Sequence, residues 1–91
     1  MTKRLILSGR VQGVFCRHFC SQYAKKLGIN GSATNLSDGT VRVLLDTDDN
    51  ELLNRFIDCL KTNPDRVRFQ GNISGVDVSE YDGVIGGDYV F

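Results

Sequence analysis

Apolar and β-branched residues mark three extended segments in the first half of the chain. A short apolar run predicts a strand over 3–8, and β-branched and aliphatic residues predict another over 40–45. The segment 29–36 is also extended, although Gly31 and small polar residues weaken its pattern. Because Ser37-Asp38-Gly39 offers a turn with a glycine for positive φ, the last two segments are expected to form a hairpin.

Two other segments carry apolar residues at helical spacing. The first covers 17–27, and the apolar face that it forms with the preceding Cys16 consists of Cys16, Cys20, Tyr23, Ala24 and Leu27. The apolar face of the second consists of Leu52, Leu53, Phe56, Ile57 and Leu60. Gly28 and Asn63-Pro64 are typical helix ends, and the residues over 46–49 provide capping oxygens at the start of the second helix.

The last third of the chain is less regular. Residues 66–69 and 73–78 are expected to form one strand with a bulge or break near Gly71. A glycine-rich segment over 83–87 then leads to a short extended piece at 89–91.

The order of elements is therefore β-α-β-β-α-β, which predicts an α+β sandwich of the ferredoxin-like type. We expect two helices on one face of a four-stranded antiparallel sheet, to which 89–91 could add a short fifth strand. In such a sheet the first and third strands are central neighbours. The loop after the first strand and the end of the second strand then lie close together at one edge. With 91 residues, the whole chain 1–91 is expected to form a single domain.

The composition of the chain argues against nucleic acids and membranes as partners. The formal net charge is zero, which gives no basic field for nucleic acid. No apolar run is long enough for a membrane span, and Ser8 and Arg10 interrupt the N-terminal apolar run that a signal peptide would need. Three cysteines at no framework spacing fit reduced thiols. We therefore expect a cytoplasmic protein that binds neither nucleic acid nor membranes.

The loop that joins the first strand to the first helix is a candidate anion-binding site. Gly9 and Gly13 punctuate it, and Arg17 lies where the helix begins. Free N–H groups at a helix start and a guanidinium fork can together bind phosphate oxygens. The alternative is a plain strand-to-helix turn with a solvated arginine, and the spacing by itself does not decide between the two.

Asn35, near the end of the second strand, is the candidate to hold a water molecule. Its amide offers both an acceptor and donors without any change of protonation. The alternative role is to cap the hairpin turn.

Two blocks of sequence resemble the signature of the acylphosphatase family. They are Gly9-Arg10-Val11-Gln12-Gly13-Val14-Phe15-Cys16-Arg17 and Asn35-Leu36-Ser37-Asp38-Gly39-Thr40-Val41, with Leu27-Gly28 and Gly31 between them. The match is close over the first half of the chain, and the second half agrees in length and element order.

The resemblance implies hydrolysis of acyl phosphates to a carboxylate and inorganic phosphate, without metal or cofactor. By position, Arg17 would bind the phosphoryl group together with backbone amides of Gln12, Gly13, Val14, Phe15, Cys16 and Arg17. Asn35 would orient the attacking water. The partners implied are a small acyl phosphate and phosphate as product or inhibitor, and we expect a monomer. A loose phosphoryl-transfer transition state mainly needs charge stabilisation and positioning, which fits so sparse a site.

Two positions depart from the family pattern. Cys16 and Ser32 stand where aromatic residues are more usual, and both changes are expected to affect packing behind the loop. Because Cys16 lies near a helix start, its thiol could be sensitive to oxidation. His18 is expected to point elsewhere on the helix, either at the surface or behind the residues that contact the substrate.

Other functions fit the sequence less well. Cys16, His18 and Cys20 cannot converge on a metal, since residues two apart on a helix do not face each other. A cysteine phosphatase needs an arginine six residues after its nucleophile, and the residues at that distance from the cysteines are Gln22, Lys26 and Asp65. RNA-recognition modules share the strand order but stack bases on aromatic side chains, which the strand over 41–45 lacks. A non-catalytic phosphate-binding or regulatory module remains an alternative.

Overall fold

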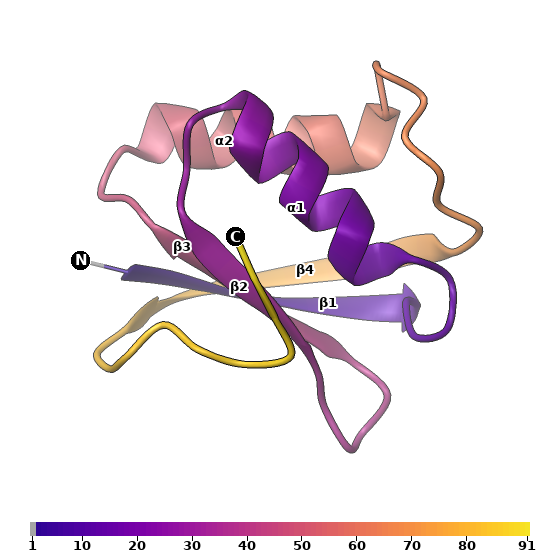
Figure 1. Ribbon diagram of the computed structural model, residues 1–91, viewed down its shortest axis with the longest axis horizontal. Helices are drawn as coiled ribbons and strands as arrows, with labels where there is room; N and C mark the ends of the chain where they lie inside the picture. Colours follow the sequence, from indigo (N-terminus) through magenta and orange to yellow (C-terminus); the bar gives the residue numbers. More distant parts are fainter. Residues whose placement is uncertain (1) are drawn as a thin grey trace.

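Five strands form one antiparallel sheet in the computed structural model, which describes residues 2–91. The elements are β1 (Thr2–Arg10), α1 (Cys16–Lys26), β2 (Gly31–Asn35), β3 (Val41–Asp46), α2 (Asn50–Thr62), β4 (Asn72–Tyr81) and β5 (Tyr89–Val90). The strand order is β4-β1-β3-β2-β5, and both helices cover the same face (Figure 1). The predicted ferredoxin-like α+β fold is thus confirmed, with β1 and β3 as central neighbours and β5 as a fifth strand.

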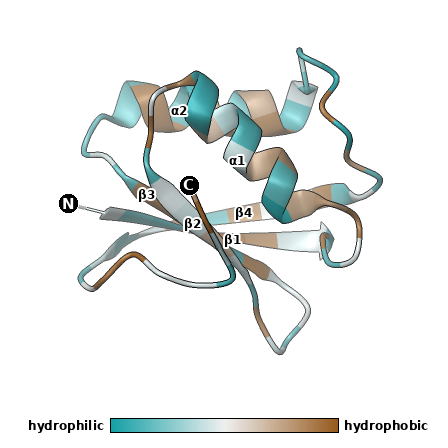
Figure 2. Cartoon of the chain, in the orientation of Figure 1, coloured by the Kyte–Doolittle hydropathy of each residue, from teal (hydrophilic) through white to brown (hydrophobic). Residues whose placement is uncertain are grey.

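The core lies between the two helices and the covered face of the sheet. Leu5 and Leu7 of β1 are paired with Val43 and Val41 of β3, and all four side chains are fully buried. From α1 they are covered by Phe19 and other apolar residues. Burial of one such side chain contributes about 1.5–3 kcal/mol. Hydrophobic and hydrophilic segments alternate along both helices, as expected when one face of each is buried (Figure 2).

The helix ends agree with the capping signals. Asp49 caps α2, where its carboxylate accepts hydrogen bonds from the backbone N–H groups of Glu51 and Leu52. Gly28 follows α1 with φ +73°, a conformation that suits glycine after a helix. Neither helix in the part of the chain that the structure describes is long and apolar enough to cross a membrane.

The prediction that residues 66–69 belong to a strand is wrong. Only 72–81 forms β4, and the preceding segment is irregular. The side chain of Asn63 provides the physical reason, because its amide accepts from the backbone N–H of Val67 and donates to the carbonyl of the same residue. Arg66 has φ +53°, which no strand residue adopts. These local hydrogen bonds replace those of a sheet ladder.

The segment between β4 and β5 brings the end of the chain to the start of α1. Ser32, one of the two departures from the family pattern, is fully buried and donates from its hydroxyl to the carbonyl of Gly86 at 2.9 Å. Gly87 has φ +141°, and a Cβ there would lie 1.8 Å from Oγ1 of Thr34. The chain at position 87 passes so close to β2 that only a glycine fits there. β5 then pairs with the outer edge of β2.

Candidate active site

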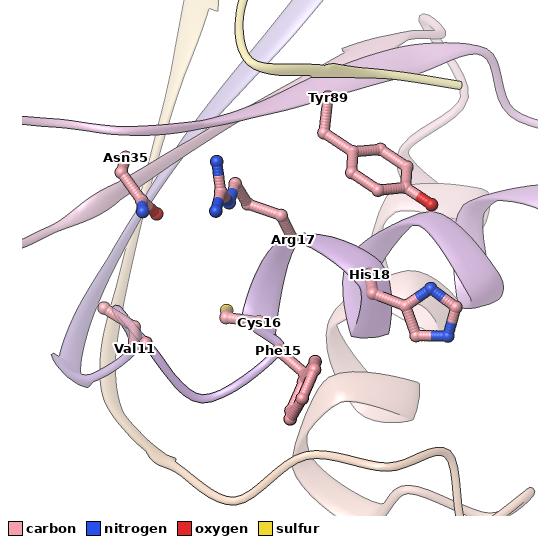
Figure 3. Close-up of a pocket in the computed structure, with 8 residues that line it drawn as sticks. Val11, Phe15, Cys16, Arg17, His18, Asn35 and Tyr89 are labelled. Atoms are coloured by element: carbon pink, nitrogen blue, oxygen red, sulfur yellow. The ribbon is translucent and has the colours of Figure 1, made fainter.

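A cavity of about 380 Å³ opens where the loop after β1 meets the edge of the sheet. The first turn of α1, the end of β2 and β5 also reach it (Figure 3). Its lining residues are Val11, Gly13, Phe15, Cys16, Arg17, His18, Asn35 and Tyr89. The loop and the end of β2 therefore lie together, as the strand order predicts.

The loop between β1 and α1 turns through two left-handed residues. Gly13 has φ +73°, and Phe15 has φ +67° and ψ +23°. A phenylalanine adopts this region only when its surroundings hold it there. The backbone N–H groups of residues 13–17 donate no hydrogen bond to any residue that the structure describes. Together with the positive end of the α1 dipole, these free donors suit an anion.

Gln12 and Val14 are absent from the cavity lining. The Nε2 of Gln12 donates to the carbonyl oxygens of Leu36 at 2.7 Å and Thr40 at 2.9 Å. Val14 is buried in the core, and its carbonyl accepts from the backbone N–H of Gln70. Any contact of these two residues with an anion would therefore come from the backbone. The side chain of Gln12 instead fixes the loop to the β2–β3 hairpin.

Arg17 lies in the first turn of α1, and its guanidinium reaches toward Asn35 (Figure 3). Its Nη1 donates to Oδ2 of Asp88 at 3.2 Å, and the Arg17 side chain is 40% exposed. The other N–H groups of the guanidinium have no partner within residues 2–91. A partly exposed guanidinium with free donors is suited to bind phosphate oxygens.

Asn35 points from the end of β2 into the same cavity (Figure 3). Its Oδ1 is buried and accepts no hydrogen bond from the described residues. Other groups make the hairpin turn, including the carboxylate of Asp38, which accepts from the backbone N–H and hydroxyl of Thr40. The side chain of Asn35 therefore takes no part in the turn. Since buried polar atoms are normally paired with protein or water, its oxygen is suited to hold a water molecule.

Cys16 and Cys20 lie one turn apart on α1, and both are buried. A hydrogen bond from the Cys20 thiol lowers the pKa of Cys16, and the charge of Arg17 acts in the same direction, although burial opposes both. The same hydrogen bond and burial raise the pKa of Cys20 well above its ordinary value. His18 is exposed, so the three side chains do not converge, and no group of three His, Cys, Asp or Glu in the described chain could hold a metal.

Three lining residues were not predicted as site residues. His18 is exposed, as expected, and its ring points away from Arg17 and Asn35, although it borders the cavity (Figure 3). The cavity extends along the first turn of α1, which includes the neighbour of Arg17. Val11 precedes that turn, and its apolar character carried no signal for a site. Tyr89 reaches the cavity only because it pairs with Ala33 across the β5–β2 edge, and no local pattern predicts such a contact.

Phe15 is 48% exposed, and it lines the cavity. The guanidinium carbon of Arg68 lies 4.5 Å from the centroid of its ring. Such a cation–π contact contributes about 0.5–1 kcal/mol at an exposed site. It helps to hold Phe15 in its left-handed conformation.

Comparisons with known proteins agree with this geometry. The family model of acylphosphatase matches residues 3–88. An acylphosphatase of Deinococcus radiodurans is 45% identical over 65 residues, which cover 71% of this chain and 74% of that protein. One of Lactococcus lactis is 47% identical over 53 residues, or 58% of this chain and 55% of that protein. The crystal structure of acylphosphatase from Bacillus subtilis superposes with a TM-score of 0.73 at 30% identity, covering 97% of this chain and 92% of that one.

Proposed function

The chain belongs to the acylphosphatase family and is an enzyme of that type, and on this premise we propose that it cleaves the carboxyl–phosphate bond of acyl phosphates. Water supplies the hydroxyl group, and the products are a carboxylate and inorganic phosphate. We propose that the domain spans 1–91 and acts in the cytoplasm as a monomer, without metal or cofactor.

In this proposal Arg17 and the loop amides bind the phosphoryl group. The free backbone N–H groups of residues 13–17 lie beside the guanidinium, which has unused donors of its own. Such donors stabilise the charge that spreads over the equatorial oxygens in a loose transition state. The backbone amide of Gln12 is included in the proposed set by its position in the motif that resembles the family signature, and its side chain holds the start of the loop against the hairpin.

Asn35 is proposed to orient the attacking water. Its unpartnered Oδ1 would accept a hydrogen bond from that water, and the neighbouring Arg17 guanidinium would hold the phosphorus in line. The water can pass its proton to a phosphate oxygen, and the leaving carboxylate is already a stable anion at neutral pH. Neither a general base nor a general acid is therefore required.

The observation that carries the proposal is the meeting of three features in one cavity. These are free loop amides, the Arg17 guanidinium and the unpaired Asn35 oxygen. The test is phosphate release from benzoyl phosphate and from p-nitrophenyl phosphate with EDTA present. We expect rapid hydrolysis of the first substrate alone, with the activity unaffected by the chelator and lost in Arg17→Gln. Phosphate binding without hydrolysis of either compound would overturn the proposal in favour of a non-catalytic phosphate-binding module.

A further inference from the structure

Asp88 places a carboxylate between the two residues to which the proposed mechanism gives the central roles. A single oxygen, Oδ2, accepts from Nη1 of Arg17 at 3.2 Å and from the backbone N–H of Asn35 at 3.1 Å. Asp88 comes from the far end of the chain, directly before β5. It lies outside the two signature blocks that carry the family resemblance.

The backbone around Asp88 is fixed to β2 on both sides. The N–H of Asp88 donates to Oγ1 of Thr34 at 3.2 Å, and the next residue, Tyr89, pairs with Ala33 in the sheet. Gly87 passes so close to Thr34 that no larger residue fits there. The backbone of Asp88 is therefore fixed to β2, and its carboxylate has a second donor besides Arg17 in the backbone N–H of Asn35.

The Arg17 guanidinium, in contrast, has Asp88 as its one hydrogen-bond partner among the described residues. A long arginine side chain loses considerable rotamer entropy when it is ordered, so a fixed partner reduces what the substrate must order on binding. The contact uses Nη1 and leaves the other donors of the planar fork free.

We propose that Asp88 is a positioning residue, which holds the Arg17 guanidinium so that its remaining N–H groups face the phosphoryl site. This inference rests on the proposed function for its consequence in catalysis. The side chains of Arg17 and Asp88 are 40% and 43% exposed, so the ion pair contributes little to folding stability. The ion pair instead restricts the motion of the Arg17 guanidinium, and it thereby raises the affinity for phosphate.

The experiment compares Asp88→Ala and Asp88→Asn with the unaltered chain. The order of the Arg17 side chain is measured by ¹⁵N relaxation of its Nε–H group, with the exposed Arg55 as an internal reference. Affinity is measured by titration with inorganic phosphate, and kcat and KM are measured with benzoyl phosphate. Asp58→Asn, an exposed carboxylate on α2, controls for the change in net charge. Thr34→Val removes the hydroxyl that accepts from the backbone N–H of Asp88, and it controls for loosening of the C-terminal segment 82–91.

We expect the Nε–H group of Arg17 to become as mobile as that of Arg55 in Asp88→Ala. Phosphate affinity should fall by about threefold to tenfold, as expected for loss of one partly exposed charge-assisted contact. Asp88→Asn keeps an acceptor for both donors and should lie between Asp88→Ala and the unaltered chain. Asp58→Asn should match the unaltered chain, and Thr34→Val should lower Tm with a smaller loss of phosphate affinity.

Other results would overturn the inference. Tighter phosphate binding in both Asp88 variants would show that the carboxylate competes with phosphate. Unchanged Arg17 mobility would show that Asp88 does not order the guanidinium. A lower Tm in the Asp88 variants, with Arg17 mobility and phosphate affinity unchanged, would show that Asp88 only fixes the C-terminal segment 82–91 to β2. If the unaltered chain hydrolyses no acyl phosphate, the proposed function fails, but the mobility of Arg17 still decides whether Asp88 positions it.

Discussion

The Nε2 of Gln12 lies 2.7 Å from the carbonyl oxygen of Leu36, and this hydrogen bond joins the phosphate-binding loop to the β2–β3 hairpin. The same nitrogen also donates to the carbonyl of Thr40 at 2.9 Å. The loop carries Arg17 and the hairpin carries Asn35. The Gln12 side chain therefore braces the two halves of the proposed site, which the order of the strands brings together.

We predict that Gln12→Ala lowers the free energy of unfolding by about 1–2 kcal/mol, since two partly buried carbonyls lose their donor. The ratio kcat/KM should also fall, because the loop is no longer held against the hairpin. Urea unfolding and benzoyl phosphate hydrolysis measure the two effects. Gln12→Glu is the matched variant, and it should destabilise more strongly than Gln12→Ala, because an acceptor-only carboxylate would place negative charge against the two carbonyl oxygens that lose their donor. Equal stability of Gln12→Glu and the unaltered chain would contradict the bracing role.

The sequence predicts those parts of the structure that are determined by residues adjacent in the chain. The start of α2 is an example, because Asp49 caps a helix that begins at the next residue. The loop at 9–17 is another, because its glycines, its arginine and the helix that follows are all adjacent in the chain.

The features that were missed depend on contacts that periodicity along the chain does not reveal. Asp88 and Asn35 are 53 positions apart, and they meet only because β5 adds to the edge of β2. The two-residue strand β5 is too short to give a periodic signal. Residues 66–69 have strand-like side chains, but the hydrogen bonds of Asn63 hold them in another conformation. In the first case a backbone pairing between distant strands decides the outcome, and in the second case the side chain of a nearby residue does.

Arg17→Gln should weaken phosphate binding and reduce turnover by about 100-fold or more, the usual range for a lost transition-state donor. A glutamine amide can replace one hydrogen bond but supplies no charge. Arg17→Lys keeps the charge without the planar fork, so it should retain more affinity than turnover. Steady-state kinetics with benzoyl phosphate and titration with phosphate test both statements. Undiminished turnover in Arg17→Gln would remove Arg17 from the mechanism.

Asn35→Ala should lose turnover by about 100-fold or more while phosphate affinity stays within about twofold of the unaltered chain. The reason is that the Asn35 oxygen is proposed to contact the water rather than the phosphoryl group. The backbone N–H of Asn35, which donates to Asp88, is retained in the alanine variant. Single-turnover hydrolysis and inhibition by phosphate separate the two effects. Full activity of Asn35→Ala would refute the water-orienting role.

Asp38 makes the hairpin beside Asn35 sensitive to acid. Hydrogen bonds from the hydroxyl and then the backbone N–H of Thr40 lower the pKa of its carboxyl group. A carboxyl group whose pKa is lowered in the folded state stabilises the fold above its unfolded pKa of about 3.9, and this contribution is lost as the pH falls through the folded value. The urea midpoint should therefore fall less between pH 5 and pH 3 in Asp38→Asn than in the unaltered chain. An identical fall in both proteins would contradict the assignment.

Cys16 should be the first cysteine of the helix pair to react with a small alkylating reagent. It lines the cavity, and its pKa is lowered by the hydrogen bond from Cys20 and by the charge of Arg17, whereas burial and that same hydrogen bond raise the pKa of Cys20. Since the thiolate is the reactive form, alkylation of Cys16 should begin below the pH at which an ordinary thiol reacts.

Treatment with iodoacetamide should therefore abolish benzoyl phosphate hydrolysis, because the added group would fill the cavity beside the loop amides. Peptide mapping should find Cys16 modified and Cys20 intact. Inorganic phosphate should slow the inactivation if it binds in the same cavity. Whatever activity Cys16→Ser retains should resist the reagent. Inactivation of that variant at the original rate would place the sensitive thiol elsewhere, at the half-buried Cys59.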